Sequence, residues 1–487
     1  MLFAAAPPSD PALRVSGAEQ GRCAVAARAL EPGDVALRSP ALAAVLHEEY
    51  RGRRCDLCFA SPAQDPAAKK PLSRCGGCKT AFYCGRACQQ VDWKLQHKAE
   101  CSAQDALVGG LEASGIHGPD ALKDAILASR CVRSSASDAP PSGTAPSGSG
   151  RLADLESMEG FMTGDERRQF ESIARAVVAA DSACSGSARL LPAGSSTRDV
   201  FAALSRFRNN NFAVVDDLFM AVGAGCFPNG AALNHSCRPN CLLTYEFQPG
   251  QPPAQVVRAM ERIPKGAELC HSYVDLALPA WERRDTLREV YGFSCACAGC
   301  AQGGGAAAEG AETGRGPGDL LLVADVEGRA ACPSPGAACP LATAPACKRR
   351  DQELEVAGQL ARRAAAEEDA ERELKLWEEV CRVRERWLHP RHTDVVAAHA
   401  AGHTAAMAAG SWGDAERHCQ RLVEHYLAVY PPWHPITGLQ MFTLGELKEQ
   451  AGACEESRKW YAKAKSIMAL THGKTHSLVL DLEGRLE

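Results

Sequence analysis

The sequence predicts a multidomain α+β protein with a β-rich core, a small metal-binding module and an all-α C-terminal domain. Runs such as "NCLLTYEF" and "AQVVRAM" alternate apolar and polar residues, which is typical of half-buried strands. Four close pairs of cysteine or histidine lie between Cys55 and Cys101, a density that favours bound zinc. After Asp351, Ala, Leu, Glu and Arg recur at helical spacing up to the end of the chain.

Composition excludes several classes of protein. A chain of 487 residues can bury two to four hydrophobic cores. Its net charge of −5 gives no overall basic surface, so we expect no direct nucleic-acid binding. No apolar run reaches the length of a membrane span, and the first ten residues lack the basic region of a secretory signal. We therefore expect a cytoplasmic and/or nuclear protein in which many of the 23 cysteines bind metal and few form disulfides.

Two segments, 134–150 and 301–318, are rich in Gly, Ala, Ser and Pro and are predicted to be flexible linkers. Between them, residues 165–180 have the pattern of an amphipathic helix. Near the end, "GDAERHCQRLVEHYLAVYP" and "GACEESRKWYAKAKSIMAL" are similar to each other at an offset of about forty residues. This repetition resembles tetratricopeptide (TPR) units, and the alternative is an unrelated helical bundle.

The four pairs near the N-terminus supply eight ligands, enough for two closed tetrahedral zinc sites of structural type. Zinc binding would contribute much of the folding free energy of so short a segment. Order and spacing resemble the MYND finger, in which the first and third pairs share one zinc and the second and fourth pairs share the other. The resemblance implies the ligand sets Cys55, Cys58, Cys84, Cys88 and Cys75, Cys78, His97, Cys101. It also implies binding of proline-containing peptides.

The octamer "NHSCRPNC" at 234–241 is open to three interpretations: a metal site, a residue pair orienting a nucleophile, or a polar loop closing a strand. Further on, "YGFSCACAGC" provides Cys295, Cys297 and Cys300, which need a fourth zinc ligand. The candidates for that ligand are Cys237, Cys241 and Cys270.

The order "NHSCRPNC", "GAELCHSYVD", "YGFSCACAGC" resembles the SET methyltransferase core and its post-SET zinc motif. Together with the MYND-like finger, the chain resembles the SMYD family of protein-lysine methyltransferases. The resemblance implies that Cys237 completes a third zinc site and that Cys241 and Cys270 are small buried residues. It divides the chain into an N-terminal part of SET (1–50), MYND finger (51–101), helical SET insertion with a flexible linker at 134–150 (102–205), core SET (206–275), post-SET (276–300), linker (301–350) and TPR-like domain (351–487).

By this resemblance the chain transfers a methyl group from S-adenosylmethionine to a lysine of a histone or non-histone protein. Free lysine titrates near pH ~10.4, so an apolar channel is needed to favour the neutral amine that attacks. Tyr273 and Tyr291 are expected to line that channel, with the Tyr273 hydroxyl near the transferred methyl. The residues expected to contact the cofactor are Gly21, Arg22, Asn210, Asn234, His235, Tyr273 and Phe293.

The chain departs from the family pattern at two places. Gly21-Arg22-Cys23 stands where the family has a Gly-x-Gly cofactor loop, so Cys23 is expected to crowd the loop and Arg22 to reach the cofactor carboxylate. Gly150 and Met158 replace cofactor-contacting residues, while Glu156 is kept. Separately, Cys332, Cys339 and Cys347 are loosely spaced and are interpreted as an irregular loop, the alternative being a fourth metal site. The altered loop keeps a second hypothesis open: a non-enzymatic adaptor that binds partner proteins through its MYND and TPR-like domains.

Overall fold

The computed structural model resolves two compact units, each with a hydrophobic core of its own. The described residues are 13–18, 21–62, 71–136, 151–184, 189–278, 280–297, 300, 345–388, 390 and 392–487. Unit 1 contains residues up to 234 together with 239–271. Unit 2 contains the tetrapeptide 235–238 and everything from 272 onward. The octamer at 234–241 is thus divided, and its His235–Arg238 segment belongs with the C-terminal half.

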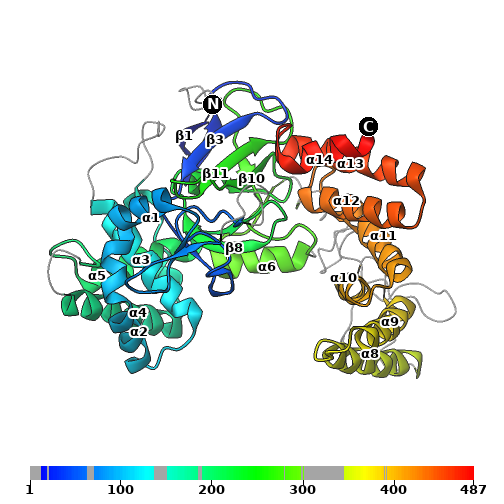
Figure 1. Ribbon diagram of the computed structural model, residues 1–487, viewed down its shortest axis with the longest axis horizontal. Helices are drawn as coiled ribbons and strands as arrows, with labels where there is room; N and C mark the ends of the chain where they lie inside the picture. Colours follow the sequence, from blue (N-terminus) through cyan, green and yellow to red (C-terminus); the bar gives the residue numbers. More distant parts are fainter. Residues whose placement is uncertain are drawn as a thin grey trace. The chain divides into compact units, whose positions relative to one another are not determined.

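Unit 1 contains small antiparallel sheets whose strands come from distant parts of the sequence (Figure 1). β11 (Ala254–Ala259) lies between β10 (Cys241–Glu246) and β3 (Val35–Pro40), and its Val256 and Val257 are buried. A second sheet has the order β4, β8, β7. The bounds of the other strands are β1 Leu13–Ala18, β2 Gly21–Ala26, β4 Ala43–Leu46, β5 Ser73–Arg74, β6 Phe82–Tyr83, β7 Asn211–Val215, β8 Ala221–Cys226, β9 Asn234–His235 and β12 Cys270–His271.

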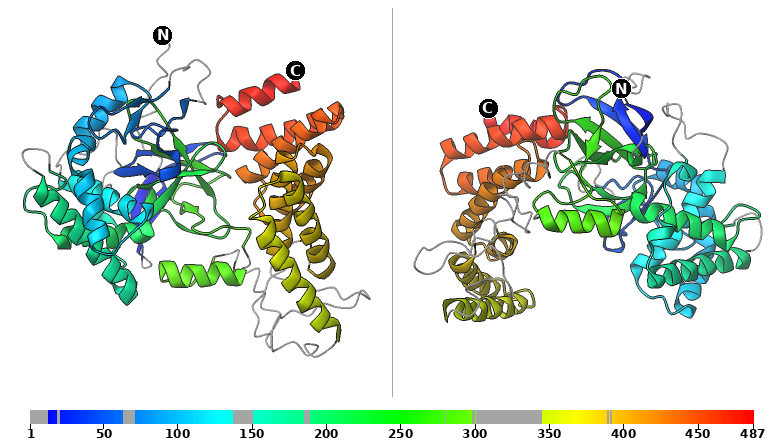
Figure 2. Two further views of the ribbon diagram at one scale, coloured as in Figure 1. Left: turned by 60° about the horizontal axis from the view of Figure 1, so that its bottom comes forward. Right: turned by 180° about the vertical axis from the view of Figure 1, so that it is seen from behind.

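The helices of unit 1 gather on one side of these strands, as the cyan and teal ribbons of Figures 1 and 2 show. α2 packs on α4, α4 on α5, and α3 on both α5 and β4. α4 begins at a capping box in which Thr163 and Glu166 satisfy each other's backbone N–H groups. The helices are α1 Arg86–Asp92, α2 Lys98–Ala113, α3 Pro119–Ala136, α4 Gly164–Ala183 and α5 Thr197–Asn210, with a π-helix at Trp93–His97 and 3₁₀ turns at Glu48–Tyr50, Leu152–Asp154, Glu159–Phe161 and Gly230–Ala232.

After α6 (Ala280–Tyr291), the described part of unit 2 from residue 345 onward consists of helices and the turns that connect them. Each helix packs on the next in sequence order, from the yellow α8 to the red α14 in Figures 1 and 2. Their bounds are α8 Pro345–Ala364, α9 Ala370–Trp387, α10 Thr393–Ala408, α11 Trp412–Val429, α12 Pro435–Gln450, α13 Cys454–Thr471 and α14 Ser477–Leu486. None of the described helices combines the length and apolar character needed to cross a bilayer.

The two similar C-terminal segments form α11 and α13, each the second helix of a helix pair. Both pairs turn through a glycine with positive φ, Gly410 at 67° and Gly452 at 77°. The backbone hydrogen bonds around these glycines also match, because Ser411 N–H reaches Ala406 O and Ala453 N–H reaches Lys448 O. The repeated sequence therefore encodes a repeated helix-turn-helix unit.

Two predicted linker boundaries are wrong. Residues 134–136 continue α3. The Ser134 and Ser135 hydroxyls donate hydrogen bonds to the backbone carbonyls of Leu42 and Cys131. Residues 345–350 begin α8, where proline is tolerated in a first helical turn. The rest of both linkers, 137–150 and 301–344, lies outside the described residues. The predicted helix at 165–180 and the strands around 241–247 and 254–260 are present as α4, β10 and β11.

Candidate functional site: three thiolate clusters and an aromatic cluster

The first and third cysteine pairs of the finger lie together in unit 1. The Sγ atoms of Cys55, Cys58, Cys84 and Cys88 are all within 4.8 Å of one another. Cys84 and Cys88 Sγ are 3.3 Å apart, and the N–H of Gly250 points at Cys88 Sγ from 3.0 Å. Four converging sulfurs and a backbone donor suit zinc bound by thiolates, whose negative charge such N–H groups stabilise.

The second and fourth pairs meet in the same way. His97 Nε2 lies 3.4 Å from Cys75 Sγ and 3.5 Å from Cys78 Sγ, and Cys75 and Cys101 Sγ are 3.9 Å apart. Gly77 is required here, because a Cβ at this position would lie 2.9 Å from Cys101 Sγ. The donors and the space kept open by Gly77 fit a second structural zinc ion.

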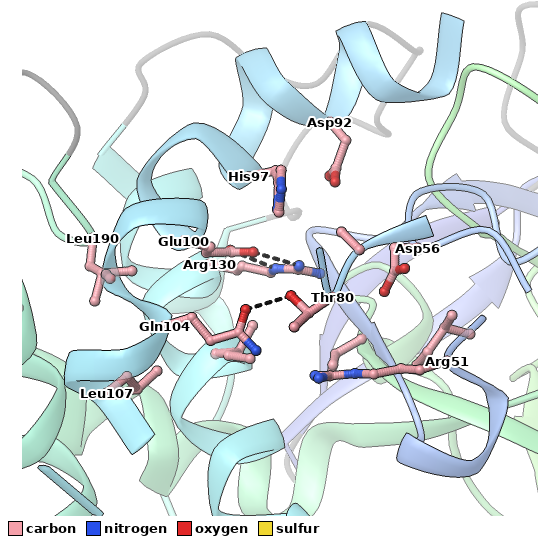
Figure 3. A pocket seen from close by; sticks show the side chains of 15 residues that line it. Arg51, Asp56, Thr80, Asp92, His97, Glu100, Gln104, Leu107, Arg130 and Leu190 are labelled. Carbon is pink, nitrogen blue, oxygen red and sulfur yellow. Dashed lines mark hydrogen bonds and ion pairs between the residues drawn. The ribbon is translucent and has the colours of Figure 1, made fainter. Parts of the chain in front are cut away.

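His97 of this second cluster also lines a small polar pocket (Figure 3). Arg130 of α3 forms two hydrogen bonds with Glu100 of α2, at 2.9 and 2.8 Å, and a third with the Ala44 carbonyl. Burial disfavours the Glu100 carboxylate, but Arg130 outweighs burial and lowers the pKa of Glu100. The pocket holds about 40 Å³, room for about one water molecule. This network joins the end of the finger to the helices of unit 1.

The third cluster lies in unit 2 and consists of Cys237, Cys295, Cys297 and Cys300. Cys237 and Cys300 Sγ are 3.6 Å apart, and Cys237 N–H donates to Cys297 Sγ at 3.3 Å. Burial and then the neighbouring thiolates raise the pKa of Cys237. A divalent ion would offset that repulsion, so this donor set also fits zinc. Among the described residues, Cys241 and Cys270 join no such cluster. Cys241 is buried, whereas Cys270 is only partly buried.

Four of the residues predicted to form the methyl-transfer site meet beside this third cluster, within unit 2. The ring centroids of Tyr273 and Tyr291 are 4.9 Å apart, and those of His235 and Tyr273 are 5.4 Å apart. Phe293 lies 6.1 Å from His235 and remains 36% exposed, which leaves part of its ring accessible. His235 Nδ1 accepts the Tyr273 N–H at 3.0 Å, and His235 Nε2 lies 3.2 Å from Cys237 Sγ.

The remaining site candidates lie in unit 1. Asn234 Nδ2 donates to Glu268 Oε1 at 2.8 Å, so Glu268 orients this side chain. Asn210 ends α5 and donates to the carbonyls of Arg206 and Glu156, at 2.6 and 3.3 Å. Sequence reasoning missed Glu268, although it stands inside the motif "GAELCHSYVD". An acidic side chain in such a motif usually faces solvent. The contact between Glu268 and Asn234 depends on the fold and cannot be predicted from the motif.

Gly21-Arg22-Cys23 is not a loop, which corrects the expectation from the sequence. These residues begin strand β2 and pair with β1, Gly21 opposite Ala18 and Cys23 opposite Ser16. Cys23 is buried, and burial followed by the charge of Glu268 raises the pKa of its thiol. Its side chain therefore belongs to a packed strand near Glu268. The hairpin pairing, which depends on partners in β1, was not visible in the tripeptide itself.

The other expected departures can be placed only in part. Met158 is buried, with its N–H bonded to the Ser205 carbonyl, and Glu156 contributes the carbonyl that Asn210 contacts. Gly150, Cys332 and Cys339 lie outside the described residues, and the side chain of Cys347 is not described.

The chain is similar to known lysine methyltransferases over most of its length. The MYND finger family matches residues 55–101. Histone-lysine N-methyltransferase ASHR1 of Arabidopsis thaliana is 26% identical over 98% of this chain and 95% of its own. Histone-lysine N-methyltransferase SMYD3 of Mus musculus is 26% identical over 96% and 94%. N-lysine methyltransferase SMYD2 of Mus musculus is 33% identical, over 59% of each chain.

The chain is thus similar to members of the SMYD family of lysine methyltransferases. Its described residues form a mixed α and β fold, with a match to the MYND finger at residues 55–101 and a helical C-terminal region. Among solved structures, the SET domain of LSMT bound to lysine and AdoHcy is 13% identical over 81% of this chain and 85% of that one, at a TM-score of 0.30. TPR-like repeats of a putative kinesin light chain from Podosopora anserina are 18% identical over 28% and 64%, at 0.22. Both scores are too low to establish a shared fold.

Proposed function

We propose that this chain transfers a methyl group from S-adenosylmethionine to lysine side chains of proteins. The observation that carries the proposal is the His235–Tyr273 pair, which links an aromatic cluster to the third thiolate cluster through a continuous set of contacts. When bound, the cofactor supplies an electrophilic methyl group on a sulfonium centre. The chain's own residues then have to orient the lysine amine and keep it neutral.

Aromatic side chains perform both tasks in this proposal. Tyr273, Tyr291 and Phe293 form apolar walls, which disfavour the charged ammonium and so lower the pKa of an inserted lysine. The Tyr273 hydroxyl accepts a hydrogen bond from the neutral amine and orients its lone pair. Holding the two reactants in line contributes the rest of the rate enhancement, so no strong protein base is required.

His235 is a positioning residue for Tyr273. Burial, and then the charge of Arg283, lowers the pKa of His235 to about 4, so its imidazole is neutral near pH 7. Because Nδ1 accepts the Tyr273 N–H, the proton sits on Nε2, which faces the sulfur of Cys237. The zinc that Cys237, Cys295, Cys297 and Cys300 would hold therefore fixes the backbone that carries Tyr273.

In unit 1, Asn234 and Asn210 offer amide oxygens, and Arg22 offers a guanidinium for the cofactor carboxylate. The proteins that this chain methylates and the peptides its finger binds are part of the same proposal: a histone or non-histone substrate, proline-containing ligands at the MYND finger, and partner proteins at α8–α14. Zinc held by thiolates needs a reducing compartment, so we propose a location in the cytoplasm and/or nucleus.

Calorimetric titration of the zinc-replete full chain with S-adenosylmethionine tests the proposal. We expect saturable binding that S-adenosylhomocysteine competes away. Arg22→Ala should weaken binding at least several-fold, whereas Arg28→Ala, an exposed arginine paired with Asp34 just after β2, should not change it. Cys23→Gly should not weaken binding either.

A non-enzymatic adaptor is the second candidate, favoured by one observation: Arg22 and the buried Cys23 occupy the place of the family's glycine loop. Folded, zinc-replete protein that binds no cofactor at millimolar concentration would refute the enzyme and leave the adaptor.

A further inference from the structure

Three buried side chains meet inside the helical domain, far along the chain from the thiolate clusters. Cys381 comes from α9, His399 from α10 and His418 from α11, and their side-chain donor atoms all lie within 4.8 Å of one another. The three residues are 3%, 5% and 0% exposed. Burying polar groups this deeply costs free energy unless they form hydrogen bonds or bind a metal ion.

The hydrogen-bond partners determine where the ring protons lie. His399 Nε2 faces Glu385 Oε1 at 3.1 Å, and His418 Nε2 faces Glu378 Oε1 at 2.8 Å. A carboxylate only accepts hydrogen bonds, so both Nε2 atoms carry protons. The two Nδ1 atoms of the neutral rings then have lone pairs, and they face each other at 2.9 Å. Such a contact is repulsive unless a cation lies between the nitrogens.

The thiol of Cys381 faces the same point. Its Sγ lies 3.9 Å from His399 Nδ1, the nitrogen that also faces His418. A proton shared by the two imidazoles would satisfy both nitrogens but would leave no reason for a third donor. A metal ion accounts for all three donors at once.

We propose that Cys381, His399 and His418 bind one zinc ion. Zinc–nitrogen bonds of about 2.0–2.1 Å and a zinc–sulfur bond of about 2.3 Å imply, in a tetrahedron, N–N near 3.3 Å and S–N near 3.6 Å. The present separations of 2.9 and 3.9 Å differ from these by only a few tenths of an ångström. Binding converts the thiol to a thiolate and releases its proton to solvent.

The surroundings are those of a prepared site. Glu385 and Glu378 hold the Nε2–H groups, the carboxylate–histidine–metal arrangement common around zinc. Gly402 lets the α10 backbone approach the His418 ring, because a Cβ there would lie 2.7 Å from its Cε1. His399 and Glu385 also line a cavity of about 440 Å³, which offers the ion a route from solvent. Water or a carboxylate can occupy the fourth coordination position.

Such an ion would join three consecutive helices of the repeat region. α9 packs on α10 and α10 on α11, and the metal would restrain both helix pairs. The site does not involve the residues proposed for methyl transfer, so its test is independent of the proposed function.

Counting zinc in purified, zinc-replete full chain tests the inference. Elemental analysis should find one equivalent less in Cys381→Ser than in wild type. Cys419→Ser is the matched control. Like Cys381, Cys419 is a buried cysteine, but it lies in α11 and contacts Gln440 rather than the cluster. We expect this control to retain the full zinc content, and we expect His399→Gln to lose the same single equivalent.

Equal zinc content in wild type and folded Cys381→Ser would overturn the proposal and leave a proton-sharing histidine pair. Circular dichroism and gel filtration establish that each variant is folded. If both ligand variants fail to fold, the wild type decides: a fourth equivalent beyond the three thiolate clusters supports the site, and three or fewer refute it.

Discussion

At the scale of single residues, His235 has the most constrained role. Its two ring nitrogens serve different partners, the Tyr273 backbone and the Cys237 sulfur. Burial keeps the ring neutral, and only the neutral ring can accept from Tyr273 while donating to a thiolate. The residue therefore couples the third thiolate cluster to the tyrosine proposed to orient the substrate.

Tyr273→Phe should lower kcat by roughly 10²-fold, the scale for losing one oriented polar group in an active site. Cofactor affinity should stay nearly unchanged, because the hydroxyl acts on the transition state more than on ground-state binding. Tritiated methyl transfer to core histones, together with calorimetry of cofactor binding, measures the two effects. Wild-type turnover by the variant would remove Tyr273 from the mechanism.

At the scale of elements, the buried Arg130–Glu100 pair joins α3 to α2, the helix that also carries the finger ligand Cys101 (Figure 3). Their side chains are 8% and 11% exposed. Removing one partner of a buried pair leaves the other charge unpaired in a medium of low polarity.

Glu100→Gln should therefore lower the free energy of unfolding by roughly 3–5 kcal/mol. Glu246→Gln is the control, because Glu246 also forms two hydrogen bonds with an arginine, Arg38, but at about one-third exposure. It should cost about 1 kcal/mol or less. Urea unfolding of both variants with bound zinc provides the comparison, and equal losses would contradict the importance of the pocket.

The turn between α11 and α12 contains a histidine that is sensitive to pH. The ring of His434 stacks on Tyr430 at a centroid distance of 3.9 Å, and Tyr430 donates to Asp275 at 2.8 Å. Burial lowers the pKa of His434 to about 4, against 6.5 for the unperturbed group, although Asp275 opposes the shift. His434 also precedes the N-terminus of α12, where a positive charge is unfavourable.

Because the folded pKa lies below the unfolded one, this stability is present above pH 6.5 and is lost as pH falls toward 4. The wild type should lose about 1.4 kcal/mol for each pH unit within that window. His434→Phe keeps the ring stack and cannot titrate, so its melting temperature should fall less between pH 7.5 and 5.5. An equal fall in the melting temperature of the two proteins between these pH values would show that His434 does not titrate on unfolding.

At the scale of the whole molecule, clusters of side chains that could bind zinc occur in both units. The two finger clusters belong to unit 1, and the cluster of Cys237 with the three post-SET cysteines belongs to unit 2. Zinc is therefore expected to contribute to the folding of each unit separately.

Cys237→Ala should remove one zinc equivalent and also weaken cofactor binding, since Cys237 contacts His235 and lies three residues after Asn234. Cys241→Ala is the control, a buried cysteine of the same octamer that joins no cluster among the described residues. Elemental analysis and calorimetry on the same samples measure both quantities. Unchanged zinc in the Cys237 variant would exclude it as a ligand.

The finger and the repeated helices could be predicted because their signals are local. Two ligands separated by two or three residues are brought together by one turn, and a helical pattern requires only neighbours along the chain. The family resemblance extended this to Tyr273 and Cys237, whose surroundings no local pattern specifies. What the sequence alone determined was therefore the set of paired metal ligands and the helical repeat, while the reaction class came from the resemblance.

Tertiary structure decided the contacts between distant segments. Glu268 reaches Asn234 across 34 positions, Gly21-Arg22-Cys23 becomes a strand only through its pairing with β1, and Arg130 reaches Glu100 from another helix. Cys381, His399 and His418 carry no recognisable spacing, because each comes from a different helix. Their convergence depends on how α9, α10 and α11 pack. Side-chain packing selects those distances, and no periodicity along the chain encodes them.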